Sequence, residues 1–253
     1  RLENSLKNTP FIGVLNSAFL GKVCNVITCK GCGHEKTNEE NFYNISLEVK
    51  KMRNLTESLD KLIQEETISD YLCENCKKKC DIGKRALLKQ LPNTLVFSLK
   101  KMCFDLQLLM NVKIHSRYEF PMNVNLKNYM YSPSGKEKAG ETAAGEEREK
   151  EQAKAELESE DCEYRLVGVV IHNGNAEYGH YTSIINTDRG DPSRQGQTPD
   201  TWLEFDDSKV TAFDMSKFEE DCFGTREDKE AYASEFAMES MVSKSAYLLF
   251  YEK

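Results

Sequence analysis

Two pairs of cysteines have the spacing that metal sites use. They are Cys29, Cys32, Cys73 and Cys76. Each Cys-x-x-Cys turn brings two thiolates together, and two such turns, here with 40 residues between them, complete a tetrahedral sulfur shell for Zn²⁺. Four protein ligands leave no open coordination position, so we predict one structural Zn²⁺ and no catalytic metal. Buried or disulfide-bonded cysteines are the alternative, and His34 or Cys80 is near enough in sequence to replace one ligand.

A histidine and an aspartate form a second candidate site. His180 follows Gly179 at the start of a predicted strand, and Asp206 ends another predicted strand 26 residues later. If the two strands are neighbours, the carboxylate can accept a hydrogen bond from the imidazole and fix the tautomer of a general base. A single histidine on a strand is more often structural, and an Asp-Asp pair more often marks a turn. Spacing alone therefore does not establish a catalytic role for His180 and Asp206.

The elements that would position these residues are mostly strands. Apolar and polar residues alternate over 45–49, as they do in a half-buried strand. Further segments with the β-branched or apolar pattern of strands are residues 86–91, 94–100, 115–120, 164–172, 180–186, 202–206 and 246–251. A turn from Asn173 to Gly179 joins two of them just before His180.

Three segments have the pattern of helices. Residues 55–64 place their leucines on one face, with Asn54 or Thr56 as the N-cap. Asp214 is the expected N-cap of a helix over 215–221, and a last helix is predicted at 228–241. Together with the strands, these helices predict an α+β fold.

Residues 132–161 differ from the rest of the chain in composition. They include no aromatic residue, and their ten acidic and five basic residues contribute −5 of the net charge of −8. Such a segment cannot bury enough apolar surface to offset the entropy lost on ordering. We predict a solvated acidic insertion, either disordered or a single exposed helix; a docking segment for a basic partner is the less favoured alternative.

Charge and hydropathy exclude several classes of protein. A net charge of −8 over 253 residues argues against a nucleic-acid-binding protein, which needs a basic surface. No segment has the roughly 18 consecutive apolar residues of a membrane span. Nine cysteines, four of them with metal spacing, favour a reducing compartment, so we expect a cytoplasmic protein, with the nucleus as the second expected location.

The ordered set of motifs resembles the ubiquitin-specific proteases, the zinc-containing cysteine deubiquitinases. The resemblance runs from residue 11 to 251 through ITCKGCGHEKTNEENFYNISLEV, YLCENCKKKCDIGKRALLKQLPNTLVFSLKK, YEFP, YRLVGVVIHNGNAEYGHYTSIIN, WLEFDDSKV and AYLLFYEK. The Cys222-Phe-Gly224 motif and a helical extension before the last strand are similar to the large fat-facets-like branch.

The resemblance implies a papain-like cysteine protease fold and a set of residue roles. Residues 11–95 would form fingers with a zinc ribbon, residues 96–131 and 162–253 a palm with a β-sheet, and 132–161 the insertion, with the thumb largely absent. His180 would be the general base, Asp206 its orienting partner and Asp207 a candidate support. Tyr181 would line the channel for the C-terminal glycines of ubiquitin, and the turn at 173–179 would be a mobile blocking loop.

The family's nucleophile motif, of the type GNTCxMNS, has no counterpart in this chain. The cysteines outside the metal motifs are Cys24, Cys80, Cys103, Cys162 and Cys222, and none has that context. The chain therefore resembles the C-terminal two-thirds of a catalytic domain whose cysteine lies upstream of Arg1 or, less favoured, in a separate chain. The expected function is a deubiquitinating thiol protease acting on ubiquitin and ubiquitinated proteins. The alternative is a non-catalytic ubiquitin-binding pseudoenzyme or scaffold module.

Overall fold

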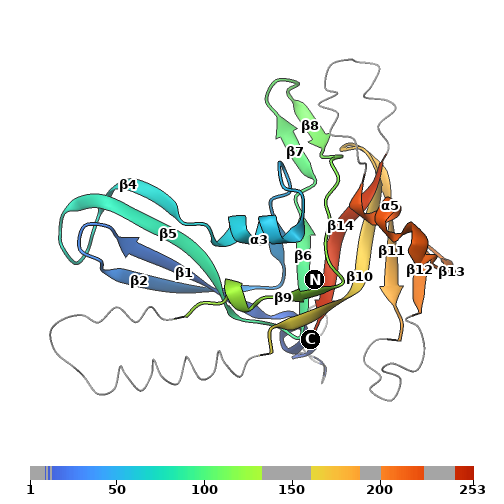
Figure 1. The fold of residues 1–253 in the computed structure, drawn as a ribbon, viewed down its shortest axis with the longest axis horizontal. Helices are drawn as coiled ribbons and strands as arrows, with labels where there is room; N and C mark the ends of the chain where they lie inside the picture. The colour runs from blue at the N-terminus through green and yellow to red at the C-terminus, as the bar shows by residue number, and fades with distance from the viewer. Residues whose placement is uncertain (1–8, 10, 12, 133–160, 189–200, 225–242) are drawn as a thin grey trace.

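The chain folds into two β-sheets and a separate hairpin, with short helices beside them (Figure 1). The structure is a computed structural model, and it describes residues 9, 11, 13–132, 161–188, 201–224 and 243–253. The predicted helix at 228–241 and almost all of the predicted insertion lie outside the described residues.

A four-stranded antiparallel sheet projects to one side of the molecule (Figure 1). Its order is β2-β1-β5-β4, and its strands are β1 (Gly21–Cys29), β2 (Glu35–Phe42), β4 (Glu66–Leu72) and β5 (Lys79–Gln90). The edge strands β2 and β4 are exposed or half-buried along their whole length. Strand β5 begins earlier than the strand predicted at 86–91. Its first half is largely polar and lacks the apolar pattern of a strand, but it pairs with β1 and β4.

The larger sheet has eight strands and forms the centre of the fold. Along its path lie β13 (Lys209–Ala212), β12 (Trp202–Asp206), β11 (Gly179–Asn186), β10 (Glu163–Gly174), β14 (Ser243–Glu252), β6 (Thr94–Leu99) and β3 (Ile45–Leu47). Strand β9 (Asn123–Asn125) also pairs with β10. All pairs are antiparallel except β3 with β6. Since β3 belongs to this sheet, the expected finger region 11–95 contributes to both sheets.

Helix α3 (Leu55–Ile63) lies where the sequence predicts a helix. The Asn54 side chain caps it by accepting a hydrogen bond from the Glu57 backbone N–H at 2.9 Å. Leu55 and Leu59 are fully buried in the main core. Ser58, also buried, donates to the Glu48 carbonyl at 2.6 Å and so ties the helix to the chain beside β3.

The remaining helices of the described residues are short. They are α2 (Val14–Phe19), η1 (Lys127–Tyr129), η2 (Met215–Lys217) and α5 (Phe218–Phe223). The predicted helix at 215–221 is thus a 3₁₀ turn followed by an α-helical turn, and Asp214 caps it as expected by accepting from the Ser216 N–H at 3.0 Å. Among the helices of the described residues, none combines the length and the apolar character needed to cross a membrane.

The strand predicted at 115–120 is wrong. The local strands are β7 (Met102–Asp105) and β8 (Met110–Lys113), which pair with each other in a hairpin. The segment after β8 is irregular: the Tyr118 N–H donates to the Phe223 carbonyl at 2.8 Å, and the Glu119 N–H to the Arg53 carbonyl at 2.9 Å. Tyr118 and Phe120 are buried there, so their apolar alternation reflects packing in the core rather than a sheet.

Candidate active site and metal centre

The four predicted metal ligands meet at the far end of the four-stranded sheet. All four sulfurs lie within 4.8 Å of one another. The two turns that present them are built alike, since the Gly33 N–H donates to the Cys29 carbonyl at 2.8 Å and the Lys77 N–H to the Cys73 carbonyl at 2.9 Å. Gly33 and Lys77 both have positive φ values, 71° and 57°, which close each turn.

This donor set fits a tetrahedral zinc ion. A Zn–S bond of about 2.3 Å places neighbouring sulfurs about 3.8 Å apart. The Cys32 and Cys73 sulfurs are 3.8 Å apart. A hydrogen bond between the Cys80 and Cys29 sulfurs, 3.1 Å apart, lowers the pKa of Cys29 to about 6, which favours the thiolate form that binds metal. The cluster is therefore consistent with one structural Zn²⁺.

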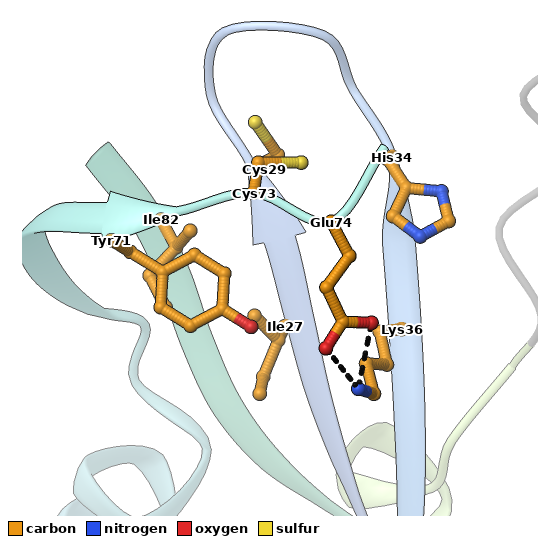
Figure 2. A pocket seen from close by; sticks show the side chains of 8 residues that line it. All are labelled: Ile27, Cys29, His34, Lys36, Tyr71, Cys73, Glu74 and Ile82. Carbon is orange, nitrogen blue, oxygen red and sulfur yellow. Dashed lines mark hydrogen bonds and ion pairs between the residues drawn. The ribbon is translucent and has the colours of Figure 1, made fainter. Parts of the chain in front are cut away.

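Neither alternative ligand joins the four-sulfur group. Cys80 lies outside it, at the hydrogen-bonded distance from the Cys29 sulfur given above. His34 lines a hollow beside the cluster, together with Cys29, Cys73 and the aliphatic and aromatic side chains drawn in Figure 2. Across this hollow Lys36 donates to both carboxylate oxygens of Glu74, at 3.2 and 3.1 Å, linking β2 to the turn after β4 (Figure 2).

His180 and Asp206 meet on neighbouring strands of the larger sheet. Strands β11 and β12 pair antiparallel with Ser183 opposite Phe205, which places the start of β11 beside the end of β12. His180 Nε2 lies 2.5 Å from Asp206 Oδ1, and the two side chains are 50% and 48% exposed. The hydrogen bond that the His180 ring donates to Asp206 raises the pKa of His180, and the charge of Asp207 acts in the same direction.

The geometry leaves one imidazole nitrogen available for chemistry. With Nε2 engaged by the Asp206 carboxylate, a neutral ring carries its proton on Nε2 and presents the Nδ1 lone pair as a base. The half-exposed ring is accessible to a reacting group. The Asp207 carboxylate lies within 4.8 Å of both other groups, and this residue makes the turn into β13 with a φ of 50°.

No cysteine of the chain is placed as a partner for this base. Among the described residues, which include all nine cysteines, no sulfur lies within hydrogen-bond distance of the His180 ring. Burial raises the pKa of Cys24 and of Cys222, which disfavours a nucleophilic thiolate at either position. In the described residues the site therefore contains an imidazole hydrogen-bonded to a carboxylate, with no thiol beside it.

The Tyr181 side chain contacts different residues from those that the His180 side chain contacts. Because side chains alternate along a strand, Tyr181 and His180 lie on opposite faces of β11. The Tyr181 ring packs against the rings of His172 and Tyr247, with centroids 4.8 and 5.6 Å apart. It is half exposed, and its role in a ubiquitin channel stays a prediction.

The turn before His180 is tightly organised. Asn175 Oδ1 accepts from the N–H groups of Glu177 and Tyr178 at 2.9 and 3.0 Å, and the Asn175 N–H donates to the Tyr178 carbonyl. A Cβ atom on Gly174, which has a φ of 152°, would lie 2.4 Å from the Gly179 Cα. The two strands therefore approach so closely at this point that glycine is required.

Two buried lysines were not predicted, and one of them, Lys113, contacts the strand that leads into this turn. Lys113 donates to the carbonyls of His172 and Gly174, and Lys101 donates to the carbonyl of Ser116 at 3.2 Å. Burial lowers the pKa of each lysine to about 8. Nothing in the local sequence pattern separates them from the many exposed lysines of the chain, because their burial depends on residues distant in sequence.

Comparisons with known proteins point to one family. The family model described as ubiquitin carboxyl-terminal hydrolase matches residues 2–251. The chain is 34% identical, over 93% of its length, to ubiquitin carboxyl-terminal hydrolase puf of Drosophila melanogaster, of which it covers 6%. It is 31% identical over its whole length to ubiquitin carboxyl-terminal hydrolase 34 of Homo sapiens, of which it covers 7%.

A solved structure gives the corresponding likeness in fold. A chain in "Structure of the SAGA Ubp8/Sgf11/Sus1/Sgf73 DUB module bound to ubiquitin aldehyde" matches 97% of this chain with a TM-score of 0.65 and 25% identity, over 43% of its own length. This likeness and the four-cysteine group confirm the predicted ubiquitin-specific protease fold. Because the family model spans almost all of its residues, the chain belongs to the ubiquitin carboxyl-terminal hydrolase family.

Proposed function

We propose that this chain supplies the base, the orienting acid and the metal-stabilised fingers of a deubiquitinating thiol protease. The observation that carries the proposal is the 2.5 Å contact between His180 Nε2 and Asp206 Oδ1 in a chain of this family. The nucleophilic cysteine would come from sequence upstream of Arg1. Ubiquitin as the partner is supported by the similar solved structure, a module bound to ubiquitin aldehyde.

In this mechanism His180 moves protons and Asp206 holds the ring in place. Nδ1 of His180 accepts the thiol proton, and the thiolate attacks the carbonyl carbon at the C-terminus of ubiquitin. The imidazolium then gives its proton to the leaving amine, which leaves a thioester. His180 next activates a water molecule that hydrolyses the thioester and restores the thiol. Asp206 keeps the ring orientation and stabilises the imidazolium in each proton transfer.

The metal's part is structural. We propose that Cys29, Cys32, Cys73 and Cys76 hold one Zn²⁺, which cross-links the turn after β1 to the turn after β4. Such a cross-link would keep the four-stranded sheet in one shape for binding ubiquitin. Nine cysteines, four of them with metal spacing, suit a reducing compartment, so we propose a cytoplasmic location, with the nucleus as the second candidate.

Turnover of a ubiquitin C-terminal fluorogenic amide tests the proposal. The chain would be expressed with the sequence that precedes Arg1, and zinc content and folding would be checked first. The wild type should release the fluorophore, and His180→Ala should lower kcat by about 100-fold or more while ubiquitin affinity is kept. His34→Ala is the matched control and should retain activity, since His34 is outside the four-sulfur group and lies between β1 and β2 of the smaller sheet, whereas His180 is on the larger sheet. A folded, zinc-loaded wild type without turnover would refute the proposal.

A second candidate is a ubiquitin-binding module without catalysis. It is favoured by the absence of any cysteine sulfur within hydrogen-bond distance of the His180 ring in the described part of the chain. This alternative predicts that the same longer polypeptide binds ubiquitin, measured by calorimetry, and shows no turnover. Turnover that depends on His180 excludes it.

A further inference from the structure

Lys113 joins the β7–β8 hairpin to the strand beside His180. It is the last residue of β8 and is 2% exposed. Its ammonium group donates to the His172 carbonyl at 2.9 Å and to the Gly174 carbonyl at 3.2 Å. Both acceptors belong to the last three residues of β10, so one cation holds the two ends of this short backbone segment.

The residue between the two acceptors is the one that faces His180. Asn173 pairs with His180 across β10 and β11, His172 pairs with Tyr181, and Gly174 pairs with Gly179. The path of β10 at these residues therefore determines where the first residues of β11 lie. His180 itself is half exposed, so its position depends on its backbone and on Asp206 more than on surrounding side chains.

A buried lysine in this place is costly for folding. Burial lowers the pKa of Lys113 to about 8. The charge of Lys113 also lowers the pKa values of the buried His172 and the half-buried His115, in addition to the effect of their own desolvation. Lys101, also buried, is a second cation, near Lys113 and His115. An apolar side chain of similar volume avoids this desolvation cost. The ammonium group's particular contribution is the pair of bonds to the β10 carbonyls.

We propose that Lys113 is a positioning residue for His180, because its two hydrogen bonds fix the end of β10 and thereby hold the His180 ring against Asp206. The catalytic consequence rests on the proposed function, in which His180 is the general base. The effect of Lys113 on the position of the His180 ring does not rest on the proposed function, and it can be measured on this chain.

The direct test is the pKa of His180 in Lys113→Met. The chain has four histidines, so their side-chain NMR signals can be assigned and titrated individually. Loss of the Asp206 contact should move the pKa of His180 down, towards about 6.5. Loss of a nearby positive charge alone would move it up or leave it unchanged. The pKa values of His172 and His115 should rise in the same variant, which shows that the charge was removed from a folded protein.

Lys101→Met is the matched control. Lys101 is 1% exposed, and its ammonium group donates to Ser116 and lies 5.5 Å from the centre of the Tyr118 ring. Its removal should raise the pKa of His115 and leave that of His180 unchanged. The proposal is overturned if Lys113→Met leaves the pKa of His180 at its wild-type value, or if both variants lower it equally. Should Lys113→Met not fold, Lys113→Gln, whose amide can still donate to one carbonyl, gives the same test with a smaller shift.

A second measurement separates this inference from the proposed function. In the longer polypeptide, Lys113→Met should lower kcat by about tenfold to 100-fold with KM changed less than about twofold, since a misplaced base affects the chemical step. An active wild type with an unchanged kcat in Lys113→Met overturns the role of Lys113. An inactive wild type refutes the proposed function instead. In that case the NMR titration alone tests whether Lys113 positions the His180 ring.

Discussion

The four-stranded and eight-stranded sheets of this chain are stabilised in different ways. The described residues form two buried clusters, and the smaller of them lies in the four-stranded sheet and consists of Cys24, Val26 and Leu87. The larger sheet contributes most of a continuous core that includes Phe97, Tyr251 and the aromatic residues around α5. The metal cluster lies on the smaller sheet, and the histidine–aspartate pair on the larger one.

This difference indicates where each sheet obtains its stability. Burying one large apolar side chain contributes about 1.5–3 kcal/mol, so the smaller buried cluster and the buried Ile82 and Leu88 of β5 offset only part of the entropy of ordering four strands. A structural zinc site supplies an apparent binding free energy of about 10–16 kcal/mol in zinc-finger peptides. We therefore expect the smaller sheet to depend on the proposed metal cross-link, whereas the larger sheet depends on burial.

Breaking the metal cluster should have the largest effect. Cys73→Ser removes one of four ligands, and we expect bound zinc to fall from one ion per chain to nearly none, with a loss of several kcal/mol of stability in the smaller sheet. Elemental analysis and chemical denaturation measure the two effects. Cys80→Ser is the control and should keep the ion, because Cys80 lies outside the four-sulfur group. A wild type that is fully stable with no bound metal would contradict the expectation that the smaller sheet depends on a metal ion.

A cavity in the larger sheet should destabilise the protein without touching the metal. Leu249 is fully buried on β14, the strand between β10 and β6. Leu249→Ala should lower the free energy of unfolding by about 2–5 kcal/mol, since it removes buried methyl groups and leaves a cavity. Denaturant unfolding measures the loss, and zinc content should remain at one ion per chain. Loss of zinc in this variant would mean that the two sheets are not stabilised independently.

A smaller loss of stability is expected at the N-cap of α3, the helix between a strand of the larger sheet and a strand of the smaller one. Asn54→Ala removes the bond to the Glu57 N–H, and we expect a loss of about 1 kcal/mol. Asn54→Gly should cost only a few tenths of a kcal/mol, because glycine tolerates the cap conformation. Thermal unfolding of the two variants checks the order. An equal loss in both would show that the cap bond contributes nothing.

The smallest expected effect on stability is at the histidine–aspartate pair. The Asp206 contact raises the pKa of His180 in the folded chain, so it stabilises the fold fully below about pH 6.5 and stops doing so as the pH rises through the folded pKa. Asp206→Asn should bring the pKa of His180 down towards about 6.5. NMR titration measures this shift, and stability curves of the two proteins should converge at alkaline pH. A pKa that stays high in Asp206→Asn would assign the shift to Asp207.

Many of the secondary-structure elements, and the residues that meet in each of the two sites, could be predicted from the sequence. The helix at α3, its Asn54 cap, most strands of the larger sheet and the meeting of four cysteines follow from local spacing and periodicity. The segment at 115–120 could not, because buried aromatics on an irregular chain alternate just as they do on a strand. The burial of Lys101 and Lys113 depends on contacts between residues far apart in sequence, as Lys113 bonds to β10 about 60 positions later.

The position of Asp206 in the larger sheet has a consequence for motion. It is the last residue of β12, and β13, the final strand on that side of the sheet, is exposed at all four residues. Terminal hairpins of this kind open locally at a free energy far below that of global unfolding. The hairpin can therefore carry the carboxylate away from the imidazole while the core stays closed. Backbone amides near Asp206 should accordingly exchange with solvent sooner than those at the centre of β10.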